Sequence, residues 1–165
     1  MITLHYIGDH AKDTWLVRFG WWLTRRVQSG EFKRVTHMEC VHAGTNYKLC
    51  TIASSSARDG GVRVKPDVAL TKGNWLALDV PNYQIEASKK WFTDFDDEPY
   101  NWIAAAGTKL PSLQWLGFAL RGFFCNWACL AAFMRDAYKA TPSQSCERLV
   151  RDCGAVGVTA EFFKD

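Results

Sequence analysis

The spacing of apolar residues in this chain changes at Pro81, and that change limits the folds that the chain can adopt. Before Pro81, apart from one helical stretch, short runs rich in β-branched and aromatic residues are separated by turn residues. After Pro81, apolar residues recur at helical spacing. Strands and helices segregated in this way predict an α+β fold, in which a small antiparallel sheet packs against helices.

Several strand-like runs are expected to form the sheet. They are Ile2–Ile7, Val35–Val41, Tyr47–Ala53, Val62–Val64 and Trp75–Val80. The segment Ala43-Gly44-Thr45-Asn46 carries turn residues between the second run and the third. These two runs are therefore expected to form a hairpin.

The first helix is expected to begin after Thr14, whose hydroxyl, like the carboxylate of Asp13, can cap a helix N-terminus. Its apolar face consists of Trp15, Leu16, Phe19, Trp22, Leu23 and Val27. Further helices are expected at Ile85–Phe95, Tyr100–Ala106, Phe124–Tyr138 and Ser143–Cys153. Most of the eight tryptophans lie among apolar residues at helical or strand spacing, so most are expected in the core.

Length and composition restrict the class of protein. A length of 165 residues predicts a single domain over 1–165, and 48% hydrophobic residues argue against disorder. No apolar stretch reaches the ~18 residues of a spanning helix, because Arg121 and Gly122 interrupt the longest, Leu110–Met134. Met1–His10 does not resemble a secretory signal, so the chain is expected to be cytoplasmic on synthesis. The net charge of +3 and the scattered basic residues argue against nucleic acid as a partner.

The six cysteines favour free thiols, because the reducing interior of a cell is expected. A framework of three disulfides stays open as the alternative. The segment Cys40-Val41-His42 with Cys125 and Cys129 lacks the spacing of ordinary zinc sites, so no metal or other cofactor is expected. The run Ser54-Ser55-Ser56 has no G-x-S-x-G context, which argues against a serine nucleophile.

Cys125 is the candidate nucleophile because of its place in the chain. It falls at the start of the expected helix Phe124–Tyr138, where unpaired backbone N–H groups and the helix dipole stabilise a thiolate. A buried cysteine that only fills space is the alternative, since cysteine packs as a small apolar residue. Cys129, one turn later, is expected to be such a residue.

His37 and Glu39 are the candidate partners of that thiol. They lie two positions apart in an expected strand, so both side chains project from the same face. A carboxylate beside an imidazole fixes its tautomer and raises its basicity. The alternative is a solvated strand face that carries both residues by chance. His42, at the end of the hairpin, and His5 and His10, near the N-terminus, have no partner of this kind in the sequence.

The order of these motifs resembles a known family. The chain carries Val35-Thr36-His37-Met38-Glu39, then Ser54 to Arg63 with its Gly-Gly-Val-Arg run, then Tyr100-Asn101-Trp102, and then Phe123-Phe124-Cys125-Asn126-Trp127. This order resembles the circularly permuted papain-like cysteine hydrolases of the NlpC superfamily, in particular the YiiX-like group and its phage-encoded relatives. In that family the histidine strand precedes the cysteine helix. The resemblance runs from about His5 to the helix after Pro142.

The resemblance implies a role for each matching residue. Cys125 is the nucleophile and His37 the general base, with Glu39 as the orienting acid. Asn46, Tyr47 or a residue of Lys48 to Ser54 are alternatives for that third position. Tyr100 matches a tyrosine that helps to bind the oxyanion. The family more often has Asp after that tyrosine and Ser after the cysteine, where this chain has Asn101 and Asn126.

A substrate groove is also expected from the placement of these motifs. Trp127 and Tyr100 would form its rim with a loop from Ser54 to Arg63. Trp102 is a further candidate for its wall. Asn126 is counted with these binding residues, and Arg63 or Arg58 would receive a substrate carboxylate.

The function implied is that of a thiol-dependent amidase or peptidase that works through an acyl-enzyme. The superfamily implies cell-wall peptides, other peptides or isopeptides, or lipid-linked acyl groups as substrates. The competing interpretation is a non-catalytic phage virion or accessory module that keeps the same fold as a scaffold. Association with virion proteins, or delivery to the cell envelope, follows from the resemblance to phage-encoded relatives.

Overall fold

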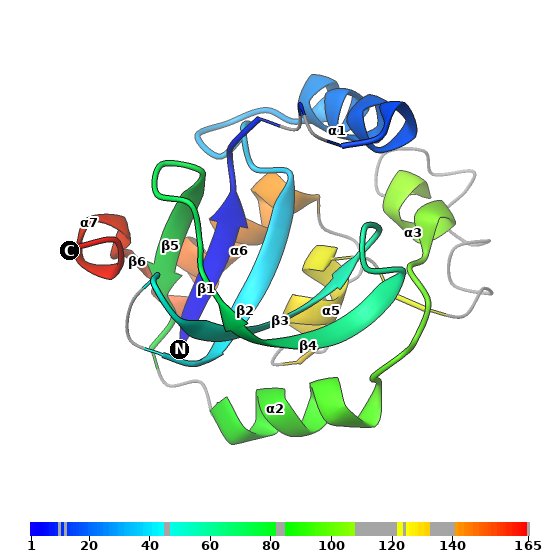
Figure 1. Ribbon diagram of the computed structural model, residues 1–165. Coiled ribbons are helices and arrows are strands. Elements are labelled where there is room, and N and C mark those ends of the chain that lie inside the picture. The colour runs from blue at the N-terminus through cyan, green and yellow to red at the C-terminus, as the bar shows by residue number, and fades with distance from the viewer. Residues whose placement is uncertain are drawn as a thin grey trace.

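The computed structural model describes residues 1–9, 11, 13–44, 47–81, 85–107, 122–123, 125–132 and 141–164. The centre of the molecule is a six-stranded antiparallel sheet with the order β4-β3-β2-β1-β5-β6 (Figure 1). Its strands are β1 (Ile2–Tyr6), β2 (His37–Ala43), β3 (Cys50–Ser56), β4 (Gly61–Val68), β5 (Trp75–Asp79) and β6 (Val156–Gly157). The described helices are α1 (Trp15–Val27), α2 (Ile85–Asp94), α3 (Trp102–Gly107), α5 (Cys125–Ala131), α6 (Pro142–Cys153) and α7 (Thr159–Phe162). The prediction of an α+β fold with an antiparallel sheet is confirmed.

The strands differ from their predicted bounds at one side of the sheet. The hairpin of β2 and β3 is confirmed, with Cys40 opposite Ala53. However, β4 is longer than the predicted Val62–Val64, because Pro66 and its polar neighbours hide the strand in the sequence. As β4 lies at the edge of the sheet, Pro66 is tolerated there. The predicted loop from Ser54 to Arg63 is also wrong: β3 continues to Ser56 and β4 begins at Gly61, so only residues 57–60 form the turn between them.

Two hydrophobic layers hold the sheet between its helices. On one side, α5 packs against β2 and β3, and its buried Cys129 and Leu130 meet Met38 and Ala53 in the main core. Leu149 of α6 belongs to the same cluster. The other side is a smaller cluster around Leu4, Val41, Ile52, Phe162 and Phe163. This packing fixes the N-terminal end of α5 over the middle strands, which is where the candidate nucleophile lies.

The first helix departs from expectation in two ways, although its bounds agree with the sequence pattern. The Thr14 side chain makes no capping hydrogen bond, and the Asp13 carboxylate instead pairs with Arg58. Trp15, Phe19 and Trp22, expected to face the core, are exposed on the surface. The apolar period of 3.6 residues identifies a shared face of a helix but does not say which side is covered.

Candidate active site

Two segments far apart in the sequence are brought together ahead of α5. Tyr100 pairs with Phe123 in an isolated parallel bridge, in which Asn101 N–H donates to the Phe123 carbonyl over 3.0 Å. Gly122 makes this approach possible: its φ is +105°, and a Cβ there would lie 2.0 Å from the carbonyl oxygen of Pro99. The Tyr-Asn-Trp motif therefore lies directly beside the segment that leads into Cys125.

The start of α5 is also fixed to the sheet. The Ser55 hydroxyl on β3 donates to the Phe123 carbonyl over 2.6 Å. One turn into the helix, the Cys129 thiol donates to the Met38 carbonyl over 3.3 Å. Burial raises the pKa of the Cys129 thiol well above its ordinary value, with Cys40 adding to the shift. Cys129 therefore holds the helix in place, in agreement with its predicted structural role.

Cys125 and His37 meet in this framework. Cys125 is the first residue of α5 and His37 the first residue of β2, and a side-chain hydrogen bond joins them. Both are buried, with exposed fractions of 2% for Cys125 and 9% for His37. The structure thus brings together the two residues that the sequence analysis chose for nucleophile and base.

Glu39 is the third member of the group. His37 Nε2 and Glu39 Oε1 are 3.2 Å apart, as the two-residue spacing on a strand predicts. Because Nε2 faces the carboxylate, Nδ1 is the ring nitrogen available to the thiol of Cys125. The arrangement is a thiol, an imidazole and a carboxylate in sequence, the order that acyl-transfer enzymes of the Cys-His-acid type use.

The charges in this group shift both pKa values strongly. Burial alone would lower the pKa of His37, but Cys125 and Glu39 outweigh it and raise the value from 6.5 to about 9. Burial would raise the pKa of Glu39, yet hydrogen bonding and charge from His37, with a contribution from Lys65, lower it to about 2. At neutral pH the histidine is therefore held as an imidazolium and Glu39 as a carboxylate.

Lys65 and Ser54 complete the surroundings of Glu39 and were not foreseen from the sequence. Lys65 Nζ donates to Glu39 Oε1 over 2.7 Å and to Asp59 Oδ2 over 3.1 Å. The Ser54 hydroxyl donates to the same Glu39 oxygen over 3.2 Å. Among the described residues, Glu39 Oε2 has no hydrogen-bond partner, although it is buried. Oε1 therefore receives three donors from three neighbouring strands, which fixes the carboxylate beside His37.

The other candidates for the third position lie elsewhere or outside the described residues. The Tyr47 ring packs on Phe163 at 5.4 Å between centroids, in the second core cluster. Asn46 is outside the part of the chain that the structure describes. Within the predicted span Lys48 to Ser54, Ser54 contacts Glu39 rather than taking its place.

The structure describes the side chains of some predicted binding residues but not of others. Tyr100 is close enough to Cys125 for the thiol to act, after burial, as the second cause that raises its pKa. Asn126 and Trp127 lie in the first turn of α5, but their side chains are outside the described set. Arg63 on β4 forms an ion pair of 2.9 Å with Asp97, which competes with any substrate carboxylate. Arg58 is likewise paired, with Asp13.

Trp21 of α1 is a neighbour of the site that the sequence did not reveal. Its ring lies edge-on to the His37 imidazole, with 6.1 Å between centroids. Trp102 of α3 lies edge-on to Tyr100 at 4.9 Å. The first helix therefore borders His37 and the third lies beside Tyr100, and in Figure 1 the two helices lie next to each other at one end of the molecule.

The remaining histidines are engaged in other contacts or lie outside the described residues. His42 Nε2 is 3.0 Å from the Ser88 hydroxyl, and burial lowers the pKa of His42 to about 4. His10 is outside the described residues. All six cysteines lie in the described part of the chain, and each is free of a disulfide, as predicted. In that same part, no three His, Cys, Asp or Glu residues are grouped so as to hold a metal ion.

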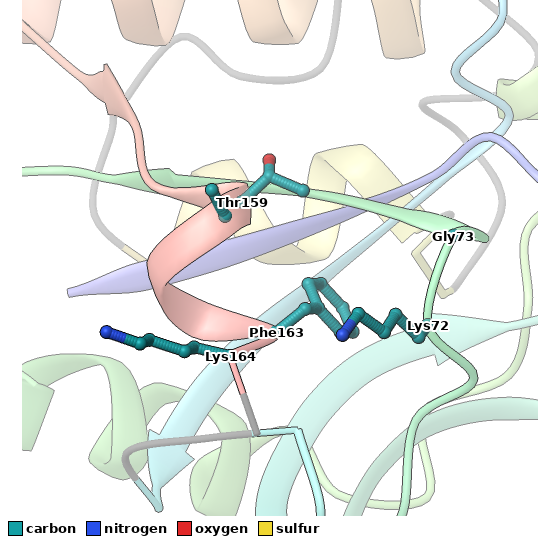
Figure 2. A pocket seen from close by; sticks show the side chains of 6 residues that line it. Lys72, Gly73, Thr159, Phe163 and Lys164 are labelled. Carbon is teal, nitrogen blue, oxygen red and sulfur yellow. The ribbon is translucent and has the colours of Figure 1, made fainter.

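An open cavity of about 600 Å³ lies away from these residues, between α7 and the turn before β5 (Figure 2). Its lining consists of Lys72, Gly73, Thr159, Ala160, Phe163 and Lys164. In Figure 2 the Lys72 side chain runs alongside the Phe163 ring, whereas Lys164 points away from it. None of the predicted site residues contributes to this cavity.

Comparison with known proteins adds no relative: no protein-family model, no curated protein and no solved structure matches the chain. Of the helices that the structure describes, none combines the length and the apolar character needed to cross a membrane.

Proposed function

We propose that the protein is a thiol-dependent amidase or peptidase, with Cys125 as nucleophile, His37 as general base and Glu39 as the orienting acid. The observation that carries the proposal is the hydrogen-bonded series from Cys125 through His37 to Glu39, at the start of a helix and the start of a strand. Two segments far apart in the sequence, β2 with His37 and Glu39 and the start of α5 with Cys125, would have to converge by chance for this series to be without purpose.

The chemistry follows from the order of the groups. The raised pKa of His37, about 9, favours transfer of the thiol proton to its imidazole, and the sulfur anion then attacks the carbonyl carbon of an amide or ester. The imidazolium then gives its proton to the leaving amine or alcohol, and a thioester remains on Cys125. Water, activated by His37, hydrolyses the thioester and restores the thiol.

In this proposal two groups stabilise the oxyanion of the reaction. The backbone N–H of Cys125 is among the first four of α5, which have no partner within the helix. The Tyr100 hydroxyl is held in its protonated form, because burial and the neighbouring thiol raise its pKa, so it can donate. Glu39 keeps the imidazole oriented through Nε2 throughout.

The fold that we propose is the circularly permuted papain-like one of the NlpC type. The support is the chain order: the histidine strand β2 precedes the cysteine helix α5, and α5 packs on β2 and β3. Cell-wall peptides, other peptides and acyl amides are the substrates that we propose to test first, with delivery to the cell envelope as the corresponding location.

A non-catalytic scaffold, such as a phage virion or accessory protein, is the second candidate. The observation that favours it is the burial of Cys125, whose exposed fraction is 2%. A small electrophile separates the two functions, since it needs little space to reach an activated thiol. A scaffold predicts that Cys125 reacts no faster than the buried Cys129.

The test is incubation of the full chain with muropeptides and model acyl amides, followed by mass spectrometry. We expect an acyl adduct on Cys125 and on no other cysteine. Cys125→Ala removes the adduct, and the matched control Cys129→Ala, one turn later on α5, retains it. An adduct that persists in Cys125→Ala, or none with any substrate or activated ester, would refute the proposal.

A further inference from the structure

The helix α1 presents a row of large aromatic side chains to solvent. Trp15 is 76% exposed, Phe19 52% and Trp22 51%, and their spacing of four and three residues puts them on one side of the helix. We call these three residues the aromatic face of α1. The rings of Phe19 and Trp22 are stacked at 5.8 Å between centroids. Contiguous exposed aromatic surface of this kind marks an interaction site more often than it is accidental.

Positive charge accompanies the aromatic face. Arg18, Arg25 and Arg26 lie on α1, which contains no acidic residue over Trp15–Val27. The Arg26 guanidinium lies over the Trp22 ring, 5.1 Å from its centroid. Asp13, just before the helix, is neutralised by Arg58. The face therefore combines aromatic rings with cationic charge that α1 itself does not balance, which is complementary to a surface that is both negative and apolar beneath.

The opposite side of the same helix borders the candidate active site. Trp21 lies against His37, with 6.1 Å between ring centroids. A Cβ at Gly20 would lie 3.7 Å from the Trp102 ring, so α3 packs closely beside α1 at that glycine. Trp102, itself 46% exposed, extends the aromatic surface towards Tyr100. The helix α1 therefore lies between the aromatic face and His37.

We propose that α1 docks the protein on the surface of an anionic phospholipid bilayer, with the aromatic face in the interfacial layer and the arginines at the lipid phosphates. An amphipathic helix with Trp and Phe in the interface and basic side chains at the headgroups binds in this way. A single convex helix offers no groove for a glycan or a peptide, whereas a bilayer interface requires none. The proposal does not depend on the chemistry of Cys125.

The test is flotation of the full chain with vesicles of equal parts phosphatidylglycerol and phosphatidylcholine, and with phosphatidylcholine alone. We expect binding to the anionic vesicles that weakens as salt is added, because exposed charges are screened. The triple variant Trp15→Ser, Phe19→Ser, Trp22→Ser is expected to bind at least about tenfold more weakly. The double variant Arg18→Gln, Arg26→Gln is expected to lose the salt-sensitive part.

Matched controls separate this surface from general hydrophobicity and from catalysis. Ile85→Ser and Val150→Ser remove exposed apolar side chains on α2 and α6, at 37% and 41% exposure, and are expected to leave flotation unchanged. Cys125→Ala is expected to float like the unmodified chain, so failure of the proposed hydrolase leaves this result intact. Circular dichroism of each variant checks that the fold is retained.

Several results would overturn the proposal. One is equal flotation of the triple variant and the unmodified chain, and another is no binding to anionic vesicles at low salt. Binding to purified cell-wall sacculi that the triple variant loses, without vesicle binding, would assign the face to a glycan instead. A dimer that the triple variant converts to a monomer in sedimentation would assign it to a second copy of this chain.

Discussion

Two histidines on neighbouring strands of the sheet each contact a cysteine of a helix, and the two cysteine–histidine pairs differ in the properties that govern reactivity. His5 on β1 and His37 on β2 belong to adjacent register pairs, His5 opposite Met38 and Tyr6 opposite His37. Cys146 Sγ lies 3.0 Å from His5 Nδ1, and a side-chain hydrogen bond joins Cys125 to His37. Proximity of a thiol and an imidazole is therefore common to both.

The partner on the far side of the imidazole distinguishes the pairs. His5 Nε2 is 3.0 Å from the Thr3 hydroxyl, which is uncharged, and burial followed by the charge of His37 lowers the pKa of His5 to about 3. His37 faces the Glu39 carboxylate, and its pKa rises to about 9 despite its burial. Burial also raises the pKa of the Cys146 thiol. His5 therefore stays neutral near neutral pH, whereas His37 beside Glu39 carries a positive charge.

The position in the helix adds to the difference. Cys125 begins α5, where the first backbone N–H groups have no acceptor within the helix and the helix dipole favours an anion. Cys146 lies beyond the first turn of α6, whose N-terminus is already closed by a capping box between Thr141 and Gln144. Cys125 therefore occupies the N-terminal end of α5, which attracts negative charge, whereas Cys146 lies in the interior of a different helix, α6.

The largest difference between the two pairs is expected when each histidine is removed in turn and the rate of Cys125 acylation is measured. His37→Ala is expected to slow acylation of Cys125 by an activated ester by about 10²–10⁴-fold, as loss of a general base does. His5→Ala is expected to leave that rate unchanged in whatever fraction remains folded. A similar loss of rate per folded molecule in both variants would show that the pairs are not functionally distinct.

The second effect concerns the carboxylate that makes the pairs different. Glu39→Gln removes the negative charge beside His37, so the pKa of His37 is expected to fall by about one to three units. The alkaline limb of the pH–rate profile for Cys125 acylation moves down with it. Glu86→Gln on the surface of α2 is a matched control, which should leave the profile in place. An unmoved profile in Glu39→Gln would remove Glu39 from the site.

The next effect is a loss of folding stability at acid pH, which arises from His5 rather than from His37. The folded pKa of His5, about 3, lies below its ordinary 6.5, so the unfolded chain takes up a proton first as the pH falls. The contribution of neutral His5 to the free energy of unfolding is present above pH 6.5 and declines below it, by about 2 kcal/mol between pH 6.5 and pH 5. Urea unfolding at these two values measures the loss, to which His42 contributes in the same direction.

Nuclear magnetic resonance gives an independent reading of the same prediction in the unmodified chain. The His5 ring signals should stay those of neutral imidazole at pH 5, whereas the His37 signals should stay those of imidazolium at pH 8. The raised pKa of His37 affects stability in the opposite direction. Protonated His37 stabilises the folded chain below pH 6.5, and this stabilisation is lost as the pH rises towards 9. Matching titrations of the two rings would contradict the comparison.

The smallest effect is expected at Lys65, which shares the Glu39 oxygen with His37. Lys65→Met removes a positive charge that competes for the carboxylate, so the pKa of His37 is expected to rise by up to about one unit. The alkaline limb of the pH–rate profile then moves up, opposite to Glu39→Gln. A purely structural role for Lys65 predicts a loss of stability with no such movement.

The parts of the site that the sequence predicted are those set by local geometry. Period-two alternation puts His37 and Glu39 on one side of a strand, and the helix pattern puts Cys125 at an N-terminus. These relations involve a few neighbouring residues. The convergence of Cys125 on His37 came instead from motif order, because no short-range rule relates positions so far apart.

The parts that the sequence missed depend on register and on which surfaces are covered. Lys65 reaches Glu39 only because β4, β3 and β2 align Lys65, Ile52 and their neighbours across the sheet. The pairing of Cys146 with His5 joins residues 141 positions apart. On α1, the apolar pattern showed which residues share a face of the helix. It did not show whether that face is exposed, because exposure depends on how the helix packs against the rest of the chain.

The most direct test of the central claim is the pH dependence of iodoacetamide alkylation, resolved for each cysteine by mass spectrometry of the folded chain. The account predicts that Cys125 reacts first near neutral pH, well before Cys146, and that His37→Ala abolishes this preference. Equal rates for Cys125 and Cys146 in the folded chain, or a Cys125 rate unaffected by His37→Ala, would contradict it.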